Sequence, residues 1–427
     1  MIDNTAVLEK AILVSAPGKG SDRQLAAEYL KELELLAETA GAQVVDKVSQ
    51  ELERPNPKTL IGKGKVEELS ALAAELGVKL VIFDDDLNPV QLRNLENKLQ
   101  LKVVDRSTLI LDIFAKHART NEAKTQVELA QLQYLLPRLT RMWTHLSKQY
   151  GGIRTKGPGE TQIESDRRAI KEKIGKLKEK LEDILVQKEQ QRKGRAAFPR
   201  FALVGYTNAG KSTLMNAITR AGVYVEDKLF ATLDTTVRTF ELPSGKQALI
   251  SDTVGFIRKL PAHLVASFRS TLAEAAEADI ILHVVDVTHE YYKDHIGVVI
   301  ETLEYLKIKD KPQVLVFNKI DRMESMAELN AIESYYNDTV FISASRSINI
   351  TGLLEHMQKK YDEQSHVVRF TLPYTQMDKI KLLYSMTDII KRNDTEHGIE
   401  LEVCVKPDMV ALFEHNFGNN QDRKSVV

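Results

Sequence analysis

Residues 201–220 read FALVGYTNAGKSTLMNAITR, and this stretch decides the fold of the domain around it. An apolar run, Phe201 to Val204, leads into the loop Gly205 to Ser212, and a helical pattern from Thr213 to Arg220 follows. Glycines at the two ends of the loop allow a tight turn in which N–H groups face phosphate oxygens, and the helix N-terminus adds partial positive charge. The stretch predicts a strand, a phosphate-binding loop and a helix in an α/β nucleotide-binding domain.

The side chains of this loop suit a nucleoside triphosphate with Mg²⁺. We expect Lys211 to reach the β- and γ-phosphates and the Ser212 hydroxyl to hold Mg²⁺. The other residues expected around the phosphates are Gly205, Tyr206, Thr207, Asn208, Ala209, Gly210 and Thr213. A glycine-rich turn with an exposed lysine is the alternative, but the flanking strand and helix patterns argue against it.

A second motif, NKID at residues 318–321, indicates which base is bound. It follows the apolar run Val314 to Phe317, where an α/β sheet brings another strand end to the same edge. The Asp321 carboxylate can accept from the N1–H and the 2-amino group of guanine, whereas adenine would leave it facing a lone pair. We therefore expect GTP rather than ATP. Beside the base we expect Asn318, Lys319, Ile320, Ser343, Ala344 and Ser345.

Two further segments complete the expected site. DTVG at 252–255 ends an apolar strand pattern, which places Asp252 near the magnesium hydration shell and the Gly255 N–H near the γ-phosphate. FATLD at 230–234 lies where a first switch loop belongs, with Thr232 as the second hydroxyl ligand of Mg²⁺ and Thr235 and Thr236 as alternatives. Lys211, Thr232 and Gly255 are the expected catalytic residues. The remaining nucleotide-binding residues in these segments are Phe230, Ala231, Leu233, Asp234, Thr253 and Val254.

Phe256 stands where many small GTPases carry a glutamine that orients the attacking water. A benzyl group cannot hydrogen-bond to water, so intrinsic hydrolysis should be slow unless another group supplies that contact. We expect Phe256 to point away from the phosphates and a partner to complete the site. The alternative is a buried hydrophobic side chain without mechanistic meaning.

Taken together, these motifs resemble the HflX family of translation-factor-related GTPases. The resemblance also covers GPGETQ at 157–162 and IGKGK at 61–65, while Thr235 departs from the proline often found there. It implies Mg²⁺-dependent hydrolysis of GTP to GDP and phosphate. It further implies a ribosome partner, chiefly the large subunit and its rRNA, bound by a monomer that dissociates stalled or idle ribosomes, including under stress.

The composition fits a cytoplasmic, multidomain α/β protein. The chain has 427 residues, 43% of them hydrophobic, which is too long for one core and indicates about three domains. We find no apolar run long enough to span a membrane and no signal-peptide pattern at Met1 to Asn4. The single Cys404 excludes an internal disulfide and fits a reducing compartment, where we expect it to be a buried core residue.

A basic segment precedes the phosphate-binding loop and is the candidate RNA contact. Residues 137–195 contain sixteen Lys and Arg against eight Asp and Glu, although the whole chain has a net charge of −1. Aromatic residues that could stack on unpaired bases lie among the cations. The named contacts are Arg138, Arg141, Lys148, Arg154, Lys156, Arg167, Arg168, Tyr134, Trp143 and Tyr150. A solvated helical face is the alternative reading of the charges.

The same segment has the pattern of a helical hairpin. An apolar seam recurs at spacings of three, four and seven between Ile163 and Ile184, and an earlier helix pattern, Val127 to Met142, offers a matching leucine face. The glycine-rich stretch Lys148 to Glu160 joins them. We expect a long stalk with a basic, glycine-rich tip; an ordinary hairpin loop is the alternative.

The ends of the chain predict two smaller domains. Up to residue 126, strand patterns alternate with helix patterns, which indicates a parallel α/β domain. The strand patterns are Ala11 to Val14, Lys79 to Phe83 and Lys102 to Val104, and the helix patterns are Arg23 to Ala40, Lys65 to Leu76 and Pro89 to Leu99. The family resemblance implies that this domain contacts RNA. Its Gly62-Lys63-Gly64-Lys65 could meet a phosphate, and Asp84-Asp85-Asp86 is expected to be a solvated turn rather than a metal site. After residue 363, strand Val367 to Leu372, helix Gln376 to Lys391 and strand Ile399 to Val405 suggest a small α+β domain.

The expected domains are therefore 1–126, the stalk 127–196, the GTPase domain 197–362 and the C-terminal domain 363–427. Two other functions stay open: an RNA-remodelling NTPase that uses ATP through the N-terminal domain, and a passive GTP-gated module that occupies the large subunit.

Overall fold

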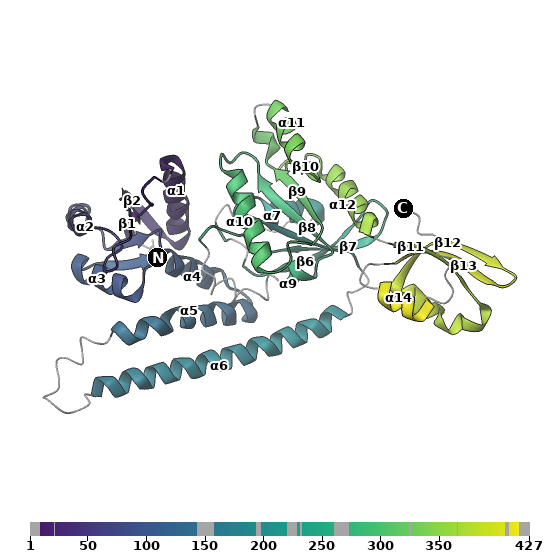
Figure 1. The fold of residues 1–427 in the computed structure, drawn as a ribbon, viewed down its shortest axis with the longest axis horizontal. Coiled ribbons are helices and arrows are strands. Elements are labelled where there is room, and N and C mark those ends of the chain that lie inside the picture. Colours follow the sequence, from purple (N-terminus) through teal and green to yellow (C-terminus); the bar gives the residue numbers. More distant parts are fainter. Residues whose placement is uncertain are drawn as a thin grey trace, which may run out of the picture.

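The computed structural model describes residues 9–20, 22–142, 158–193, 198–219, 229–230, 233–259, 273–323, 326–364, 366–405 and 410–417. An N-terminal domain, a helical hairpin, a central domain and a C-terminal domain are visible in Figure 1, with the two terminal domains on opposite sides of the central domain. Multidomain α/β architecture is thus confirmed.

The N-terminal domain is a four-stranded parallel sheet with strand order β2-β1-β3-β4. Residues of β1 alternate between two cores: Ala11 and Leu13 pack with α1 and α4, whereas Ile12 and Val14 pack with α2 and α3. This alternation explains why β1 reads as continuously apolar. The strands are β1 (Glu9–Ser15), β2 (Ala42–Ser49), β3 (Leu80–Phe83) and β4 (Lys102–Asp105), and the helices are α1 (Arg23–Ala40), α2 (Lys63–Leu76), α3 (Pro89–Leu99) and α4 (Arg106–His117).

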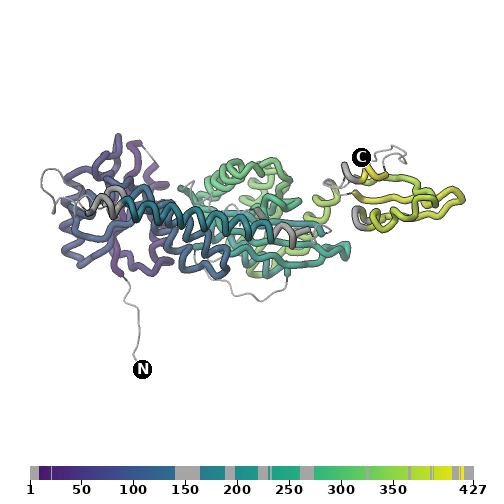
Figure 2. Tube along the Cα trace, turned by 90° about the horizontal axis from the view of Figure 1, so that it is seen from below, coloured from purple at the N-terminus to yellow at the C-terminus, as the bar shows by residue number. Residues whose placement is uncertain are grey.

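Two long helices, α5 (Asn121–Met142) and α6 (Pro158–Lys193), lie side by side along the N-terminal and central domains (Figures 1 and 2). Within α6, Leu177 is buried and Ile170, Ile174, Leu181 and Ile184 are half-buried, so the predicted seam is confirmed over this stretch. Of the predicted glycine-rich stretch Lys148 to Glu160, residues 148–157 lie outside the described residues, and Pro158 begins α6.

The central domain is a six-stranded mixed sheet with strand order β10-β9-β8-β5-β7-β6, in which β6 alone runs antiparallel to its neighbour. The carboxyl ends of its parallel strands meet at one edge, which is where such sheets bind ligands. The strands are β5 (Arg200–Gly205), β6 (Thr236–Glu241), β7 (Gln247–Asp252), β8 (Ile280–Asp286), β9 (Gln313–Asn318) and β10 (Thr339–Phe341). The helices are α7 (Lys211–Thr219), α9 (Ala273–Glu277), α10 (Tyr292–Tyr305), η1 (Ile320–Arg322), α11 (Met326–Tyr335) and α12 (Ile350–Gln364).

The C-terminal domain is a three-stranded antiparallel sheet, β11-β13-β12, with helices against it, so the α+β expectation is confirmed. The predicted helix Gln376 to Lys391 is wrong beyond Met386, because Thr387 begins a strand. Its β-branched residues, Thr387, Ile389 and Ile390, favour extended backbone, and pairing with β13 satisfies that backbone. The elements are β11 (His366–Leu372), η2 (Tyr374–Lys379), α13 (Ile380–Met386), β12 (Thr387–Thr395), β13 (Gly398–Val405) and α14 (Val410–Phe417).

Two expectations from composition can be compared with the structure. Among the described residues, no helix is long and apolar enough to cross a membrane. Cys404 is half-buried on β13 rather than in the core, because the buried face of that strand carries Leu401, Val403 and Val405.

Candidate nucleotide-binding site

The phosphate-binding loop joins β5 to α7 at the carboxyl edge of the central sheet, and two of its glycines are required by close contacts. A Cβ at Gly205 would lie 2.2 Å from the carbonyl oxygen of Val284. Gly210 has φ +92°, and a Cβ there would lie 2.3 Å from Nδ2 of Asn318. Only glycine at both positions therefore lets the loop backbone lie this close to Val284 and Asn318.

Lys211 is buried beneath this loop. Its Nζ donates to the carbonyl oxygens of Gly205, at 3.1 Å, and Tyr206, at 2.8 Å. Burial lowers the pKa of Lys211 to about 8, and the charge of Asp252 only partly offsets this effect. A bound phosphate would therefore stabilise an ammonium group that burial destabilises.

Oxygen atoms of the kind that bind Mg²⁺ lie beside Lys211. The Ser212 hydroxyl donates to the Asp252 carboxylate at 2.6 Å. The Thr207 hydroxyl is buried, and no hydrogen-bond partner for it lies among the described residues. A Cβ at Gly255 would lie 2.9 Å from Cα of Thr207 and 3.0 Å from Nζ of Lys211. Hydroxyl and carboxylate oxygens are the ligands that Mg²⁺ prefers, so this corner fits a phosphate-bound Mg²⁺.

Asn318 links three of the sequence motifs. Its Nδ2 donates to the carbonyl oxygen of Ala209 at 2.9 Å, and its Oδ1 accepts from the backbone N–H of Ala344 at 2.9 Å. The phosphate-binding loop, NKID and Ser343-Ala344-Ser345 therefore come together, as the sequence predicts.

The expected guanine reader, Asp321, lies in η1 next to these contacts. Its carboxylate lies 3.3 Å from Nε of Arg346. A hydrogen bond from Ser343 lowers the pKa of Asp321, and the charge of Arg346 acts in the same direction. The carboxylate is thus held in the ionised form that accepts from guanine.

Asp286 was not among the expected site residues, but it pairs with Lys319 at 2.6 Å and orients the NKID lysine. The sequence carries a signal for it: the mainly apolar run Ile280 to Val285 ends at this residue, so a further strand brings a carboxylate to the same sheet edge.

Phe256 points away from the loop, as expected. It is 2% exposed and packs in a cluster with Val204, Ile281 and Leu303. Its backbone N–H donates to the Gly205 carbonyl at 3.0 Å, and its carbonyl accepts from the Thr207 N–H at 2.7 Å. The ring is therefore fixed in the core and supplies no polar group to the phosphates.

The described part of the first switch loop lies against the N-terminal domain. Phe230 contacts Phe114 edge to face, with 4.7 Å between ring centroids. The Asp234 carboxylate accepts from the backbone N–H groups of Arg119, at 3.0 Å, and Thr120, at 3.3 Å, and from the Thr120 hydroxyl. Ala231 and Thr232 lie outside the described residues, so the magnesium role of Thr232 stays a prediction.

Asp84 is not a solvated turn, contrary to expectation. It is 1% exposed and pairs with Arg106 at 2.7 Å and with Lys259 of the central domain at 2.8 Å. No group of acidic, histidine and cysteine residues within the described ranges is arranged to hold a metal. Sequence spacing could not indicate these partners, because Lys259 lies 175 residues away along the chain.

Two expected RNA contacts are engaged inside the protein. Arg138 pairs with Asp105 at 3.3 Å and lies over the Tyr134 ring, whose hydroxyl donates to the same carboxylate. Arg167 and Arg168 are exposed on α6. Of the others, Trp143, Lys148, Tyr150, Arg154 and Lys156 lie outside the described residues, and the side chain of Arg141 is not described.

The Gly62-Lys63-Gly64-Lys65 motif starts α2, but its polar groups already have partners. Lys65 pairs with Glu68 at 2.8 Å, Lys63 approaches Glu67 at 3.6 Å, and the Gly62 N–H donates to Gln50 at 2.9 Å. These contacts account for the motif as a helix start.

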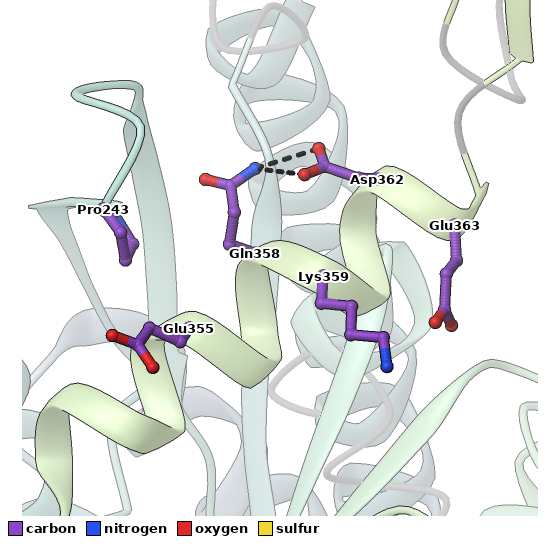
Figure 3. Close-up of a pocket in the computed structure, with 6 residues that line it drawn as sticks. All are labelled: Pro243, Glu355, Gln358, Lys359, Asp362 and Glu363. Atoms are coloured by element: carbon purple, nitrogen blue, oxygen red, sulfur yellow. Dashed lines mark hydrogen bonds between the residues drawn. The ribbon is translucent and has the colours of Figure 1, made fainter.

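A surface pocket lies on α12 beside the turn between β6 and β7, at the opposite edge of the sheet from the phosphate-binding loop. Gln358 donates from Nε2 to both carboxylate oxygens of Asp362 at 2.9 Å (Figure 3). The lining residues are Pro243, Glu355, Gln358, Lys359, Asp362 and Glu363. With three carboxylates and one lysine, the pocket is unsuited to phosphate.

Family models match most of the chain. Residues 27–115 match the N-terminal region of GTP-binding GTPases, 117–195 match their middle region, and 200–319 match the 50S ribosome-binding GTPase family.

Curated relatives match over more than three quarters of the chain. GTPase HflX of Lacrimispora saccharolytica is 44% identical, covering 97% of this chain and 98% of the relative. GTPase HflX of Escherichia coli is 43% identical, covering 78% and 79%. A solved GTP-binding protein of Sulfolobus solfataricus, in complex with GDP, is 27% identical over 83% of this chain and 98% of that chain, with a TM-score of 0.44.

Proposed function

Because this chain belongs to the HflX family of GTPases and hydrolyses GTP, we propose that it binds the large ribosomal subunit and uses GTP to dissociate stalled or idle ribosomes. We place this activity in the cytoplasm and expect a single copy of the chain to act on each ribosome, including under stress. The relatives and the family model for residues 200–319 support the ribosome as partner.

In residue terms, Lys211 and the loop N–H groups hold the phosphates, and Asp321 reads guanine. Ser212 and Thr232 hold Mg²⁺, which when bound neutralises charge on the phosphates. Asp252 and Gly255 respond to the γ-phosphate. The remaining contacts to the nucleotide come from Gly205, Tyr206, Thr207, Asn208, Ala209, Gly210, Thr213, Asn318, Lys319 and Ser343 to Ser345.

The proposed RNA contacts are the stalk, residues 127–196, and the N-terminal domain, residues 1–126. The described part of α6 carries a row of exposed cations. Lys173 pairs with Glu128 of α5 at 2.5 Å and Lys176 pairs with Glu172 at 2.7 Å. Arg167, Arg168, Lys171, Lys178 and Lys180 are exposed along the same helix.

The observation that carries the proposal is the burial of Phe256 beside the residues expected to bind the nucleotide. The phosphate-binding loop and NKID lie together, but a core phenyl group stands where a water-orienting amide would be useful. Such a site is typical of a GTPase that hydrolyses GTP slowly until a partner supplies the missing contact.

Sucrose-gradient sedimentation of intact ribosomes with the full chain tests this proposal. We expect separate subunits with GTP or a non-hydrolysable GTP analogue, and intact ribosomes with GDP. The matched variant is Asp321→Asn. Its side-chain NH₂ can donate to the 2-carbonyl of xanthine, but in guanine it would face the 2-amino group, which is also a donor. This variant should lose dissociation with GTP and regain it with xanthosine triphosphate.

Three outcomes would contradict the proposal. Intact ribosomes that carry the chain with GTP would indicate a passive binding module. Dissociation that ATP supports equally well, and that survives Lys211→Ala, would indicate an NTPase acting through the N-terminal domain. Unchanged GTP dependence in Asp321→Asn would remove the guanine assignment.

A further inference from the structure

We infer that Tyr206 and Glu32 are positioning residues that hold the second switch segment, residues 252–258, where Gly255 meets the γ-phosphate. Glu32 belongs to α1 of the N-terminal domain, so that domain helps to distinguish GTP from GDP. This role goes beyond the proposed ribosomal function and depends on nucleotide binding alone.

Gly255 already lies over the phosphate-binding loop. The nearest atoms to a Cβ built on it are Cα and Cγ2 of Thr207, both at 2.9 Å, and Nζ of Lys211, at 3.0 Å. Because Lys211 is the expected ligand of the β- and γ-phosphates, the Gly255 backbone is at the γ-phosphate end of the site. The contacts that hold residues 252–258 therefore determine whether Gly255 stays at this end of the site.

Tyr206 provides one of these contacts from within the phosphate-binding loop. Its hydroxyl accepts from the backbone N–H of Arg258 at 3.1 Å. Its ring is stacked on His295 of α10, with 3.8 Å between centroids and 6° between planes, and the residue is 6% exposed. A buried, stacked ring leaves the hydroxyl little freedom, so it fixes the switch backbone relative to the loop.

Glu32 sets the direction of that hydrogen bond. The Tyr206 hydroxyl donates its proton to Glu32, which leaves an oxygen lone pair to accept from Arg258. Burial, and then the charge of Glu32, raise the pKa of Tyr206, so the hydroxyl keeps its proton. Glu32 is itself held by Arg106, which is 1% exposed.

The N-terminal domain also holds the Arg258 side chain. The guanidinium lies 2.9 Å from the centroid of the Tyr29 ring, 3.5 Å from Asp84 and 3.5 Å from Glu32. The backbone and the side chain of Arg258 are thus anchored to the same surface of the N-terminal domain, which Tyr29 and Glu32 of α1 share with Asp84. Since GDP has no group opposite Gly255, loosening this anchor should weaken binding of the triphosphate alone.

Tyr206→Phe tests the inference because it removes the hydroxyl and keeps the stacked ring. We expect affinity for a non-hydrolysable GTP analogue to fall about three- to tenfold, as for loss of one buried hydrogen bond. Affinity for GDP should change less than about twofold, because the backbone N–H through which Tyr206 contacts the nucleotide is unaltered. Both are measured on the full chain by equilibrium titration. Tyr305→Phe, at an exposed tyrosine of α10, is the matched control and should change neither affinity.

Equal weakening for both nucleotides would show a general structural role and overturn the inference, as would no change for either. Glu32→Gln is the second variant and should give the same selective loss. If it fails to fold because Arg106 loses a buried partner, Tyr206→Phe decides alone. Failure of the unaltered chain to bind either nucleotide would instead remove the nucleotide site itself.

Discussion

Lys211 shows how a single side chain couples the fold to the binding of phosphate. Its pKa is lowered to about 8 by burial, whereas bound phosphates favour the charged form and must raise that pKa. The affinity for the nucleotide should therefore be highest below the pKa that Lys211 has in the free protein, and it should fall as the pH rises through that pKa. A lysine in water would show no such change until pH approached its ordinary value of about 10.4.

We predict that affinity for GDP falls about fourfold between about pH 7 and about pH 8.5, with uptake of a proton on binding. Isothermal titration calorimetry in two buffers of different ionisation enthalpy measures both quantities. A flat affinity with no proton uptake would show that Lys211 is already fully charged in the free protein.

Residue identities in the nucleotide site could be predicted from sequence because their chemistry is local. The phosphate-binding loop, NKID and DTVG each lie at the end of an apolar strand pattern, so topology brings them together. Glu32 could not be predicted in the same way. It meets Tyr206 across 174 residues, and such a pairing arises only when two domains pack.

At the scale of elements, the start of α5 is joined to the first switch loop. The Thr120 hydroxyl accepts from the Ala123 N–H at 3.1 Å, as a helix cap does, and the same hydroxyl donates to Asp234. A carboxylate at a helix N-terminus also interacts favourably with the helix dipole. Movement of this loop with the nucleotide would therefore disturb the base of the stalk.

Asp234→Ala should loosen this start without unfolding the helix. Loss of charge-assisted hydrogen bonds predicts that the amides of Arg119 and Thr120 exchange with solvent about tenfold faster or more. Hydrogen–deuterium exchange of the full chain measures this, with Asp310→Ala at an exposed loop position as the control. Unchanged exchange at these amides would show that Asp234 does not stabilise the helix start.

Elements were predictable where periodicity and length agreed. The helices Arg23 to Ala40 and Pro89 to Leu99 match α1 and α3 in full. No element was predicted at β2 or α4, and the helix predicted at Gln376 to Lys391 runs past the end of α13 into β12. That last boundary is set by pairing of β12 with β13, a contact that one segment's pattern does not contain.

At the scale of the whole molecule, one surface of the N-terminal domain meets both switch segments. Phe230 and Leu233 of the first segment, and Val254 and Ile257 of the second, belong to the same apolar cluster as α4 and α5. A nucleotide-driven change in either segment must therefore alter packing between domains. This arrangement suits the proposal that the N-terminal domain and the stalk bind RNA in response to GTP.

We propose that this chain is a slow GTPase whose site the large ribosomal subunit completes. The measurement is the rate of GTP hydrolysis by the full chain with and without purified large ribosomal subunits. We expect the subunits to raise turnover at least about tenfold, because Phe256 offers the attacking water no hydrogen bond. An equal rate in the two conditions would show that the ribosome does not complete the site.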